Sequence, residues 1–314
     1  MARVSTPQGR WSDLDRPPLA APSLRAALLA PAGPLARLEV LEEVGSTNAE
    51  LVARAAADPA GWPAPAVITA DSQTRGRGRL GRGWDAPPRS GVAVSLLLRP
   101  RISPEAWGWL PLAAGVAVTG MVRDLAGLPA TVKWPNDVLV EGRKLCGILV
   151  EVVPGSSAGG QAGPAGVVVG VGVNTTSTRE ELDAGDLTGA TSLRLEGAAT
   201  TDRDVLVRAL VRALLAEVER FEAADGDAAG SGLAARAAEA CSTLGRRVTV
   251  HLPGGEQLHG IAEGLDGHGR LLVRPDTASE GNGDDDGGDG DGDGDRDSGA
   301  SAVAVSAGDV VHVR

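Results

Sequence analysis

The chain has 314 residues, of which 42% are hydrophobic, enough to build the cores of one large domain and one small second domain. Aromatic residues make up only 2%, so Val, Leu and Ala must fill these cores. The formal charge of −11 is uneven, because residues 276–297 hold ten acids and one base; their charge of −9 leaves −2 for the rest, which excludes a strongly acidic working surface.

The lack of a predicted signal peptide or membrane span, together with the cysteine usage, indicates a cytoplasmic protein without a membrane partner. The N-terminal residues contain no apolar run after their basic residues, which excludes a signal peptide. The longest apolar stretch, Trp107–Val122, is interrupted by Gly, Pro and Thr and is shorter than the ~20 residues of a membrane span. Cys146 and Cys241 have no C-x-x-C spacing, and we expect them to be buried, reduced thiols.

The chain order of predicted elements begins with a leader. Residues 1–36 are predicted to be disordered, because their Pro- and Ala-rich sequence shows no periodicity, although residues 23–30 are compatible with a short helix. A large domain follows over 37–243. Its elements are expected as strand 38–43, helix 49–57, strands 67–71 and 91–99, helix 104–125, strands 131–133, 137–140, 144–153 and 167–173, and helix 202–222.

Three details of this domain can be predicted more closely. The apolar run 91–99 has no alternation, which indicates a strand buried on both faces. Thr47 or Asn48 would cap the helix over 49–57. Thr201 with Asp204 resembles a capping box for the last helix.

The sequence changes character after Gly245, and residues 244–314 are predicted to form a small all-β domain. Short alternating strands are expected over 247–251, 257–263, 270–274, 302–306 and 309–313. The Asp/Gly-rich segment 276–300 cannot bury apolar surface and is predicted to be a disordered loop. Its string DGDGDG at 289–294 is similar to a Ca²⁺ loop but lacks the later Glu that such a loop requires, which favours solvated disorder.

The distribution of histidines limits the chemistry of the larger domain. All four histidines fall in the C-terminal domain, at His251, His259, His268 and His312. A Ser-His-Asp triad, a Cys-His pair and a metal site built on His or Cys are therefore excluded from the larger domain. Its chemistry must use Lys, Arg, carboxylates, amides and main chain, which is typical of reactions limited by positioning and charge neutralisation, such as attack at a phosphate.

The most unusual string is GRGRLGRGW at residues 76–84, here called the Gly-Arg loop, and three interpretations compete for it. A dinucleotide-binding turn of the Rossmann type would open a helix, whereas an apolar strand follows here. A nucleic-acid-binding arginine–glycine segment would be long and repeated, whereas this loop is short. The favoured interpretation is a mobile loop that folds over an anionic ligand, because glycines permit close main-chain approach and arginines bind phosphate or carboxylate.

Two further strings have both a structural and a chemical interpretation. KWPND at 133–137 is either a turn between strands or a group of Lys, amide and carboxylate that belongs to a site. Lys144 begins an apolar strand, which favours an ammonium facing a cleft over a solvated one. GVGVN at 170–174 ends a buried strand, and close packing explains its small residues as well as a site does.

Taken together, these strings resemble the biotin–protein ligase family. Four strings match in order: GSTN at 45–48, the Gly-Arg loop, KWPND through RKLCGIL at 133–149, and GVGVN at 170–174. The resemblance runs from about residue 38 to 313, and the middle two strings are highly specific together. It implies a mixed α/β (α+β) catalytic domain with a central sheet, followed by a small SH3-like β-barrel.

The resemblance also implies a reaction and its residues. Biotin is joined to AMP at the expense of ATP with Mg²⁺, and the biotinyl group then passes to a lysine on the biotin carboxyl carrier domain of a carboxylase. The implied biotin-binding residues are Ser46, Thr47, Asn48, Gln73, Arg77, Gly78, Arg79, Lys144 and Gly147. The implied ATP-binding residues are Arg77, Arg79, Lys133, Asn136, Asp137, Lys144 and Asn174, and the implied catalytic residues are Lys144, Arg79 and Asp137.

Two departures from the family pattern keep alternatives open. Some members carry an N-terminal helix-turn-helix, but no second helix precedes residue 38 here, so DNA is not expected as a partner. The acidic segment is outside the family pattern and leaves the role of the small domain in ATP or acceptor binding open. A lipoate-type acyl-protein ligase and a biotin-sensing regulator without turnover are the alternatives; the repeated Gly-Arg pattern disfavours the first and the missing DNA-binding module the second.

Overall fold

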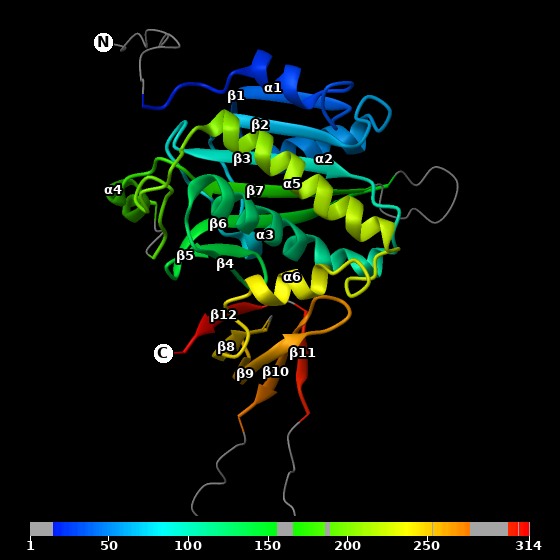
Figure 1. Cartoon of the computed structure of the whole chain (residues 1–314), viewed down its shortest axis with the longest axis vertical. Helices are drawn as coiled ribbons and strands as arrows, with labels where there is room; N and C mark the ends of the chain where they lie inside the picture. Colours follow the sequence, from blue (N-terminus) through cyan, green and yellow to red (C-terminus); the bar gives the residue numbers. More distant parts are fainter. Residues whose placement is uncertain are drawn as a thin grey trace, which may run out of the picture.

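The computed structural model describes residues 15–155, 166–185, 189–252, 254–276, 301–306 and 308–313. The start of the predicted leader and nearly all of the acidic loop predicted over 276–300 therefore lie outside the described residues. Figure 1 shows a large part built on one sheet and, below it, a smaller sheet that carries the C-terminus. The larger part holds strands β1 to β7 and the smaller part strands β8 to β12.

Seven strands form the central sheet in the order β1-β2-β3-β7-β6-β5-β4. Their bounds are β1 Arg37–Val44, β2 Ala66–Gln73, β3 Gly91–Leu98, β4 Ala130–Lys133, β5 Asp137–Val140, β6 Arg143–Val153 and β7 Gly166–Asn174. The pair β1 and β2 is parallel, and the other neighbouring strands are antiparallel. Strand β3 is buried along most of its length, as its continuous apolar sequence predicts.

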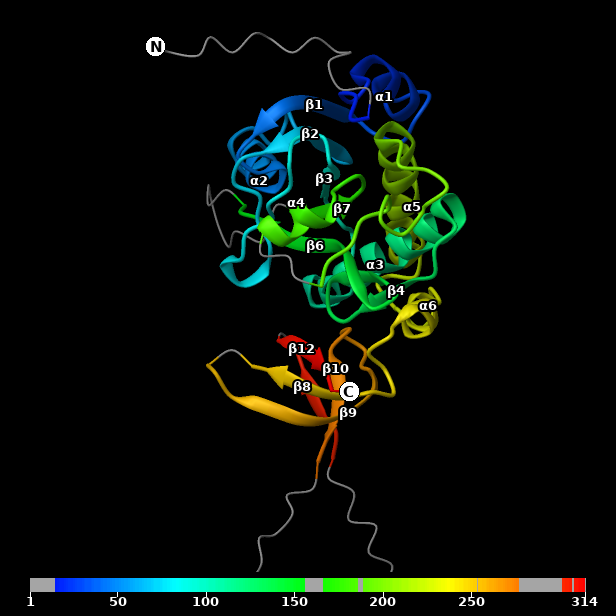
Figure 2. The ribbon, with the colours of Figure 1, turned by 90° about the vertical axis from the view of Figure 1, so that its left-hand side faces the viewer.

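Helices lie on both faces of this sheet. They are α1 Ala21–Leu28, α2 Thr47–Ala57, α3 Leu110–Met121, α4 Arg179–Ala184, α5 Arg203–Ala223 and α6 Leu233–Ala240. Helices α1, α3 and α5 lie on one side of the sheet and α2 on the other (Figure 2). The short helices α4 and α6 were not predicted, because neither is long enough to show a clear apolar period.

The single helix expected over 104–125 is divided into three pieces. A 3-10 segment, Pro104–Trp109, precedes α3, and a π-type turn, Val122–Ala126, follows it. Proline in the first turn of α3 has no N–H to donate, so the α-helical hydrogen-bonding pattern begins there. Gly127 ends the whole segment in the left-handed conformation, with φ of 69°.

Two helix caps differ from the expectation. Ser46, rather than Thr47 or Asn48, caps α2 through its side-chain oxygen. Asp202, rather than Thr201, caps α5. The shift at α2 has a consequence for function, because it places Thr47 and Asn48 inside the first helical turn, where both are buried.

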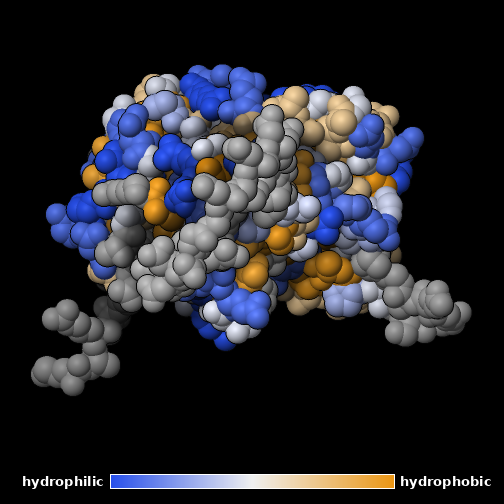
Figure 3. Space-filling view, turned by 90° about the horizontal axis from the view of Figure 1, so that it is seen from below, coloured by the Kyte–Doolittle hydropathy of each residue, from blue (hydrophilic) through white to orange (hydrophobic). Residues whose placement is uncertain are grey.

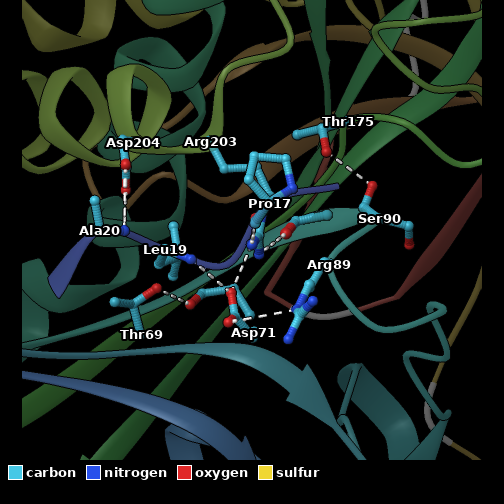
Figure 4. A network of polar contacts seen from close by, with 12 residues as sticks. Pro17, Leu19, Ala20, Thr69, Asp71, Arg89, Ser90, Thr175, Arg203 and Asp204 are labelled. Carbon is cyan, nitrogen blue, oxygen red and sulfur yellow. Dashed lines mark hydrogen bonds and ion pairs between the residues drawn. The ribbon is translucent and has the colours of Figure 1, made fainter. Parts of the chain in front are cut away.

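Residues 15–36 are folded against the catalytic domain, and the prediction of disorder is wrong for them. Helix α1 packs against α5, and its Leu24 is fully buried. The Asp71 carboxylate accepts hydrogen bonds from Leu19 N at 3.0 Å and from Arg203 Nη2 at 2.5 Å, and the same guanidinium donates to Pro17 O at 2.7 Å (Figure 4). Asp71 on β2 and Arg203 on α5 thus make the hydrogen bonds that the backbone of this segment needs, although its own sequence shows no periodicity.

The C-terminal domain is a five-stranded antiparallel sheet in the order β11-β10-β9-β8-β12, which confirms the predicted small all-β domain. Its strands are β8 Arg247–His251, β9 Gln257–Leu265, β10 Leu271–Pro275, β11 Val303–Val305 and β12 Asp309–His312. Two buried tryptophans of the catalytic domain fix it in place: Trp109 Nε1 donates to Gly267 O at 2.9 Å and Trp134 Nε1 to Gly269 O at 3.1 Å. Both tryptophans belong to a core that the two domains share.

The exposed surface is mixed. Seen from below, hydrophilic residues interrupt the hydrophobic ones over the visible face (Figure 3). None of the described helices combines the length and apolar character that crossing a bilayer requires. Cys146 and Cys241 are buried free thiols, as predicted.

Candidate active site

A pocket of about 710 Å³ opens on the face of the sheet that α2 covers, and it extends to the C-terminal domain. Twelve of the thirteen residues predicted from the sequence line it: Ser46, Thr47, Asn48, Gln73, Arg77, Gly78, Arg79, Lys133, Asn136, Asp137, Lys144 and Gly147. They come from α2, four strands and two loops, so only the fold brings them together.

One end of the pocket, here called the neutral end, is lined by Ser46, Thr47, Asn48 and Gln73, with buried Ser95 behind them, and none of these residues is ionisable. Thr47 donates to Gln73 Oε1 from its main-chain N at 2.8 Å and from its hydroxyl at 3.0 Å. Ser95 Oγ donates to Asn48 Oδ1 at 2.6 Å and lies 2.9 Å from Thr47 Oγ1. The end is therefore a preformed hydrogen-bonding cage suited to a neutral polar group.

Asn48 has a supporting position in this cage. Its amide Nδ2 donates to Leu149 O at 3.1 Å and to Glu151 Oε2 at 3.0 Å, while its oxygen accepts from Ser95. Because both amide hydrogens are engaged inside the protein, Asn48 joins α2 to β6 and holds the cage in shape.

Glycines form the floor of the pocket. Gly147 on β6 and Gly172 on β7 are paired across the sheet, and Trp84 lies over both of them. A Cβ atom would stand 3.0 Å from the indole at Gly147 and 2.8 Å from it at Gly172, so only glycine leaves room for the ring. The glycines of GVGVN therefore serve the site by allowing close approach, and Trp84 is a site residue that the sequence analysis quoted without assigning a role.

The Gly-Arg loop borders the pocket from above this floor. Main-chain hydrogen bonds from Gly78 N to Arg82 O, at 2.8 Å, and from Trp84 N to Gly76 O, at 3.0 Å, close it on itself. Arg77 Nη2 donates to both oxygens of Glu151, at 2.9 and 3.0 Å, and Arg79 Nη1 donates to Asn136 Oδ1 at 3.1 Å. Both arginines predicted to bind anions thus have partners in the protein, and Glu151 is a further residue that the sequence analysis missed.

The centre of the pocket holds a cation and an anion in contact. Lys144 Nζ lies 2.7 Å from Asp137 Oδ1, with 32% and 20% of their side chains exposed. The ammonium is also 5.8 Å from the centre of the Trp84 ring. Asp137 is the single carboxylate among the described residues that line the pocket. The structure thus favours the cleft-facing interpretation of Lys144.

The other end, here called the cationic end, consists of Lys133, Arg246 and His312. Burial, and then the charges of Lys133 and Arg246, lower the pKa of His312 to about 4, so the imidazole is neutral at pH 7. His312 Nε2 lies 3.1 Å from the hydroxyl of buried Thr243. Arg246 and His312 were not predicted, because only the docking of the C-terminal domain brings them to the pocket.

Asn174 is the one predicted site residue outside the lining of the pocket. It stands at the end of β7, only 1% exposed, and its Nδ2 donates to Thr191 O at 2.9 Å. Thr191 N in turn donates to Lys144 O at 2.8 Å. Asn174 is thus linked through Thr191 to the strand that bears Lys144, and its contact with ATP stays a prediction.

No group of three or more His, Cys, Asp or Glu side chains among the described residues could hold a metal ion. Any ion in this pocket would depend on oxygen atoms that a ligand brings with it.

Two family models match separate parts of the chain, and one relative aligns over nearly all of it. Residues 45–174 match the Biotin/lipoate A/B protein ligase family, and residues 243–313 match the Biotin protein ligase C terminal domain. The chain is 41% identical to a biotin–[acetyl-CoA-carboxylase] ligase of Mycobacterium tuberculosis, over 95% of this chain and 97% of that protein. It is 32% identical to the bifunctional ligase/repressor BirA of Escherichia coli, over 76% of this chain and 69% of that protein.

Solved structures have the same fold. A biotin protein ligase from Aquifex aeolicus in complex with biotin and ATP aligns with a TM-score of 0.64 over 88% of this chain and 99% of that chain, at 23% identity. A biotin acetyl coenzyme A carboxylase synthetase from Helicobacter pylori with bound biotinylated ATP aligns with a TM-score of 0.51 over 76% of this chain and 97% of that chain, at 21% identity. At these identities the likeness establishes the fold alone.

Proposed function

This chain belongs to the biotin protein ligase family, and on that basis we propose that it joins biotin to AMP using ATP and then transfers the biotinyl group to a lysine of a biotin carboxyl carrier domain. One observation carries the proposal: a single pocket holds a neutral hydrogen-bonding end, a central ammonium and a cationic end. The proposal includes a cytoplasmic location, which suits two buried free thiols.

In the first step an oxygen of the biotin carboxylate attacks the α-phosphorus of ATP. The bond from that phosphorus to the bridging oxygen of pyrophosphate breaks, pyrophosphate leaves, and biotinyl-AMP remains. The neutral end holds the ureido group of biotin by hydrogen bonds from the cage. The attack of one anion on another is opposed mainly by their charge repulsion. Lys144, Arg77 and Arg79 offset this repulsion between the carboxylate and the phosphate.

Mg²⁺ fits this site as a companion of ATP. Asp137 and the amide oxygen of Asn136 are hard oxygen donors in the lining, and Mg²⁺ commonly takes only one or two protein ligands beside phosphate oxygens and water. When bound, it supplies positive charge to the phosphates of ATP.

Closure of the Gly-Arg loop over the ligand involves an exchange of partners. Arg77 binds Glu151 in the structure described here. A carboxylate or phosphate in the pocket would replace Glu151 as the partner of the Arg77 guanidinium. The loop then shields the mixed anhydride from water, while Trp84 keeps its far end anchored on the glycine floor.

In the second step the ε-amine of the acceptor lysine attacks the acyl carbon of biotinyl-AMP, an amide bond forms and AMP leaves. The amine must first lose a proton, because a free lysine has a pKa of ~10.4. Asp137, the single carboxylate in the described lining, is assigned as the acceptor of that proton. Asp137→Asn should slow transfer from supplied biotinyl-AMP at neutral pH, and a transfer rate equal to that of the wild type would remove Asp137 as the base.

The decisive experiment incubates the chain with ATP, Mg²⁺, biotin and a biotin carboxyl carrier domain, and follows the carrier by intact mass. The expected result is the gain of one biotinyl group on one lysine. A parallel assay of pyrophosphate release compares biotin with lipoate. Release with lipoate alone would replace the proposal by a lipoate-type ligase, and biotin binding without release would replace it by a regulator.

A further inference from the structure

We propose that Lys133, Arg246 and His312 form a binding subsite for the leaving pyrophosphate, built jointly by the catalytic domain and the C-terminal sheet. The inference rests on the proposed function, because it assigns a place to one product of the first step. It gives the C-terminal domain a direct part in adenylation and assigns roles to two residues that lie outside the motifs of the catalytic domain.

The strand order sets the sequence of groups along the pocket. Thr47 and Gln73 stand at the β2 and β3 side, and Gly172 follows on β7. Lys144 on β6 and Asp137 on β5 come next, and Lys133 pairs with Asp137 from the edge strand β4. Beyond that edge lies the C-terminal domain, and the segment that leads into it is joined to β4 by a hydrogen bond of 2.8 Å from Ser242 N to Val132 O. The cationic end is therefore separated from the neutral end by the Lys144 centre.

The chemistry of the first step then places the pyrophosphate. Attack at the α-phosphorus is in line, so the leaving oxygen departs on the side opposite the attacking carboxylate. With biotin held at the neutral end and its carboxylate at Lys144, the opposite side is the cationic end. Arg246 can bind a phosphate with two parallel hydrogen bonds, and Lys133 adds a point charge.

His312 suits the same anion through its hydrogen bonding. The hydroxyl of Thr243 accepts a hydrogen bond from Trp134 N at 3.1 Å, so its own hydrogen is available to His312 Nε2 at 3.1 Å. In the tautomer with the ring hydrogen on Nδ1, Nε2 accepts from that hydroxyl and Nδ1 is left as a donor. The neutral imidazole can then donate to a phosphate oxygen beside the two cations without adding a third positive charge to the empty site.

The subsite is held in a fixed position before any ligand arrives. The hydrogen bonds of Trp109 and Trp134 to main-chain carbonyls of the C-terminal domain fix the two domains relative to each other. Gly308, Val311 and Val313, which flank His312 along β12, line the same pocket. A preorganised donor costs no reorganisation when the pyrophosphate develops its charge.

The test compares four variants: His312→Ala, His312→Asn, Arg246→Ala and the control His259→Ala. His259 is an exposed histidine of the same domain that also contacts a threonine hydroxyl, with its Nδ1 3.0 Å from Thr249 Oγ1. Arg246 is exposed as well, so its removal leaves the core untouched. Asparagine at 312 keeps an amide donor near the place of Nδ1.

The dissociation constants of inorganic pyrophosphate, AMP and biotin are measured for each variant at a fixed Mg²⁺ concentration, together with biotin transfer from supplied biotinyl-AMP. His312→Ala and Arg246→Ala should each weaken pyrophosphate about tenfold, the usual effect of losing one hydrogen bond to a charged group. His312→Asn should recover part of that loss. Binding of AMP and biotin, and transfer from biotinyl-AMP, should stay within twofold of the wild type, as should every property of His259→Ala.

Pyrophosphate binding that is equal in the wild type, His312→Ala and Arg246→Ala would overturn the subsite while leaving the proposed ligase activity intact. Weakening of AMP by the same factor as pyrophosphate would also overturn it, because the two residues would then serve the nucleoside monophosphate. Failure of the wild type to release pyrophosphate from ATP and biotin would instead refute the proposed function itself.

Discussion

The neutral end and the cationic end of the pocket are suited to different ligand groups and use different side chains to bind them. The neutral end is made of buried hydroxyl and amide groups whose hydrogen bonds to one another are 2.6–3.0 Å long. The cationic end places two charged groups and a neutral imidazole at the edge of the sheet, with the Arg246 side chain exposed. A neutral ligand group can be selected by a closed, dehydrated cage, whereas charged phosphates need cations that remain partly solvated until the ligand arrives.

The two ends also depend on different parts of the chain. The neutral end is built within the catalytic domain, from the first turn of α2 and the neighbouring strands. The cationic end exists only because the C-terminal sheet docks against β4 through Trp134 and Thr243. Substitutions at one end should therefore affect one substrate and leave the other nearly unchanged.

The largest expected effect comes from the centre that joins the two ends. Lys144→Ala removes the ammonium that faces both reacting anions, and adenylation measured by pyrophosphate release should fall about a thousandfold. Arg143→Ala is the matched control, because this neighbouring cation pairs with Glu196 at 2.7 Å, outside the pocket. Biotin and ATP should still bind to Lys144→Ala. A rate near that of the wild type would show that the two substrates react without the Lys144 ammonium between them.

The next largest effect is expected from a substitution that distorts the neutral end alone. Gly170→Ala places a Cβ atom against the amide of Asn48, which is held by hydrogen bonds to β6 and cannot give way without losing them. The cost of such overpacking is about 2 kcal/mol, so the KM for biotin should rise about thirtyfold. Gly120→Ala, in α3 with nothing within 4 Å, is the control and should leave KM unchanged. An equal rise in the KM for ATP would contradict the separation of the two ends.

A smaller effect is expected from a substitution that removes one hydroxyl group from the cage. Thr47→Val keeps the shape of the side chain but removes the hydroxyl that donates to Gln73 and faces Ser95. The KM for biotin should rise about tenfold, which corresponds to one buried hydrogen bond, while ATP binding stays constant. Thr249→Val removes a hydroxyl in the C-terminal sheet and serves as the control. If biotin binding were insensitive to Thr47→Val, the cage would act through shape alone.

The smallest effect concerns the cationic end and pH. The pKa of His312 is lowered to about 4 in the folded protein, from 6.5, so the unfolded chain binds more protons between these values. The contribution of this group to stability is therefore present above pH 6.5 and is lost as the pH falls towards 4. Urea unfolding of His312→Asn should show a shallower loss of stability than the wild type across this range. Identical pH dependence in both proteins would show that His312 is not held neutral by burial and by the charges of Lys133 and Arg246.

Sequence reasoning reached most of the site because its residues fall in short strings with unusual chemistry. The Gly-Arg loop and KWPND combine glycine, cations, an amide and a carboxylate in a few positions, and such strings are rarely needed for packing alone. The same reasoning misjudged a segment whose order depends on distant neighbours. The leader 15–36 is ordered by Asp71 and Arg203, which lie far away in the sequence.

By itself, the sequence determined the order of the strands and of the longer helices and the polar groups that meet at Lys144, because these follow from local periodicity and from residue chemistry. The tertiary structure alone decided that Trp84 rests on Gly147 and Gly172, and that His312 and Arg246 reach the pocket. Those features arise from packing between segments far apart in the chain, and no local pattern records which surfaces will meet.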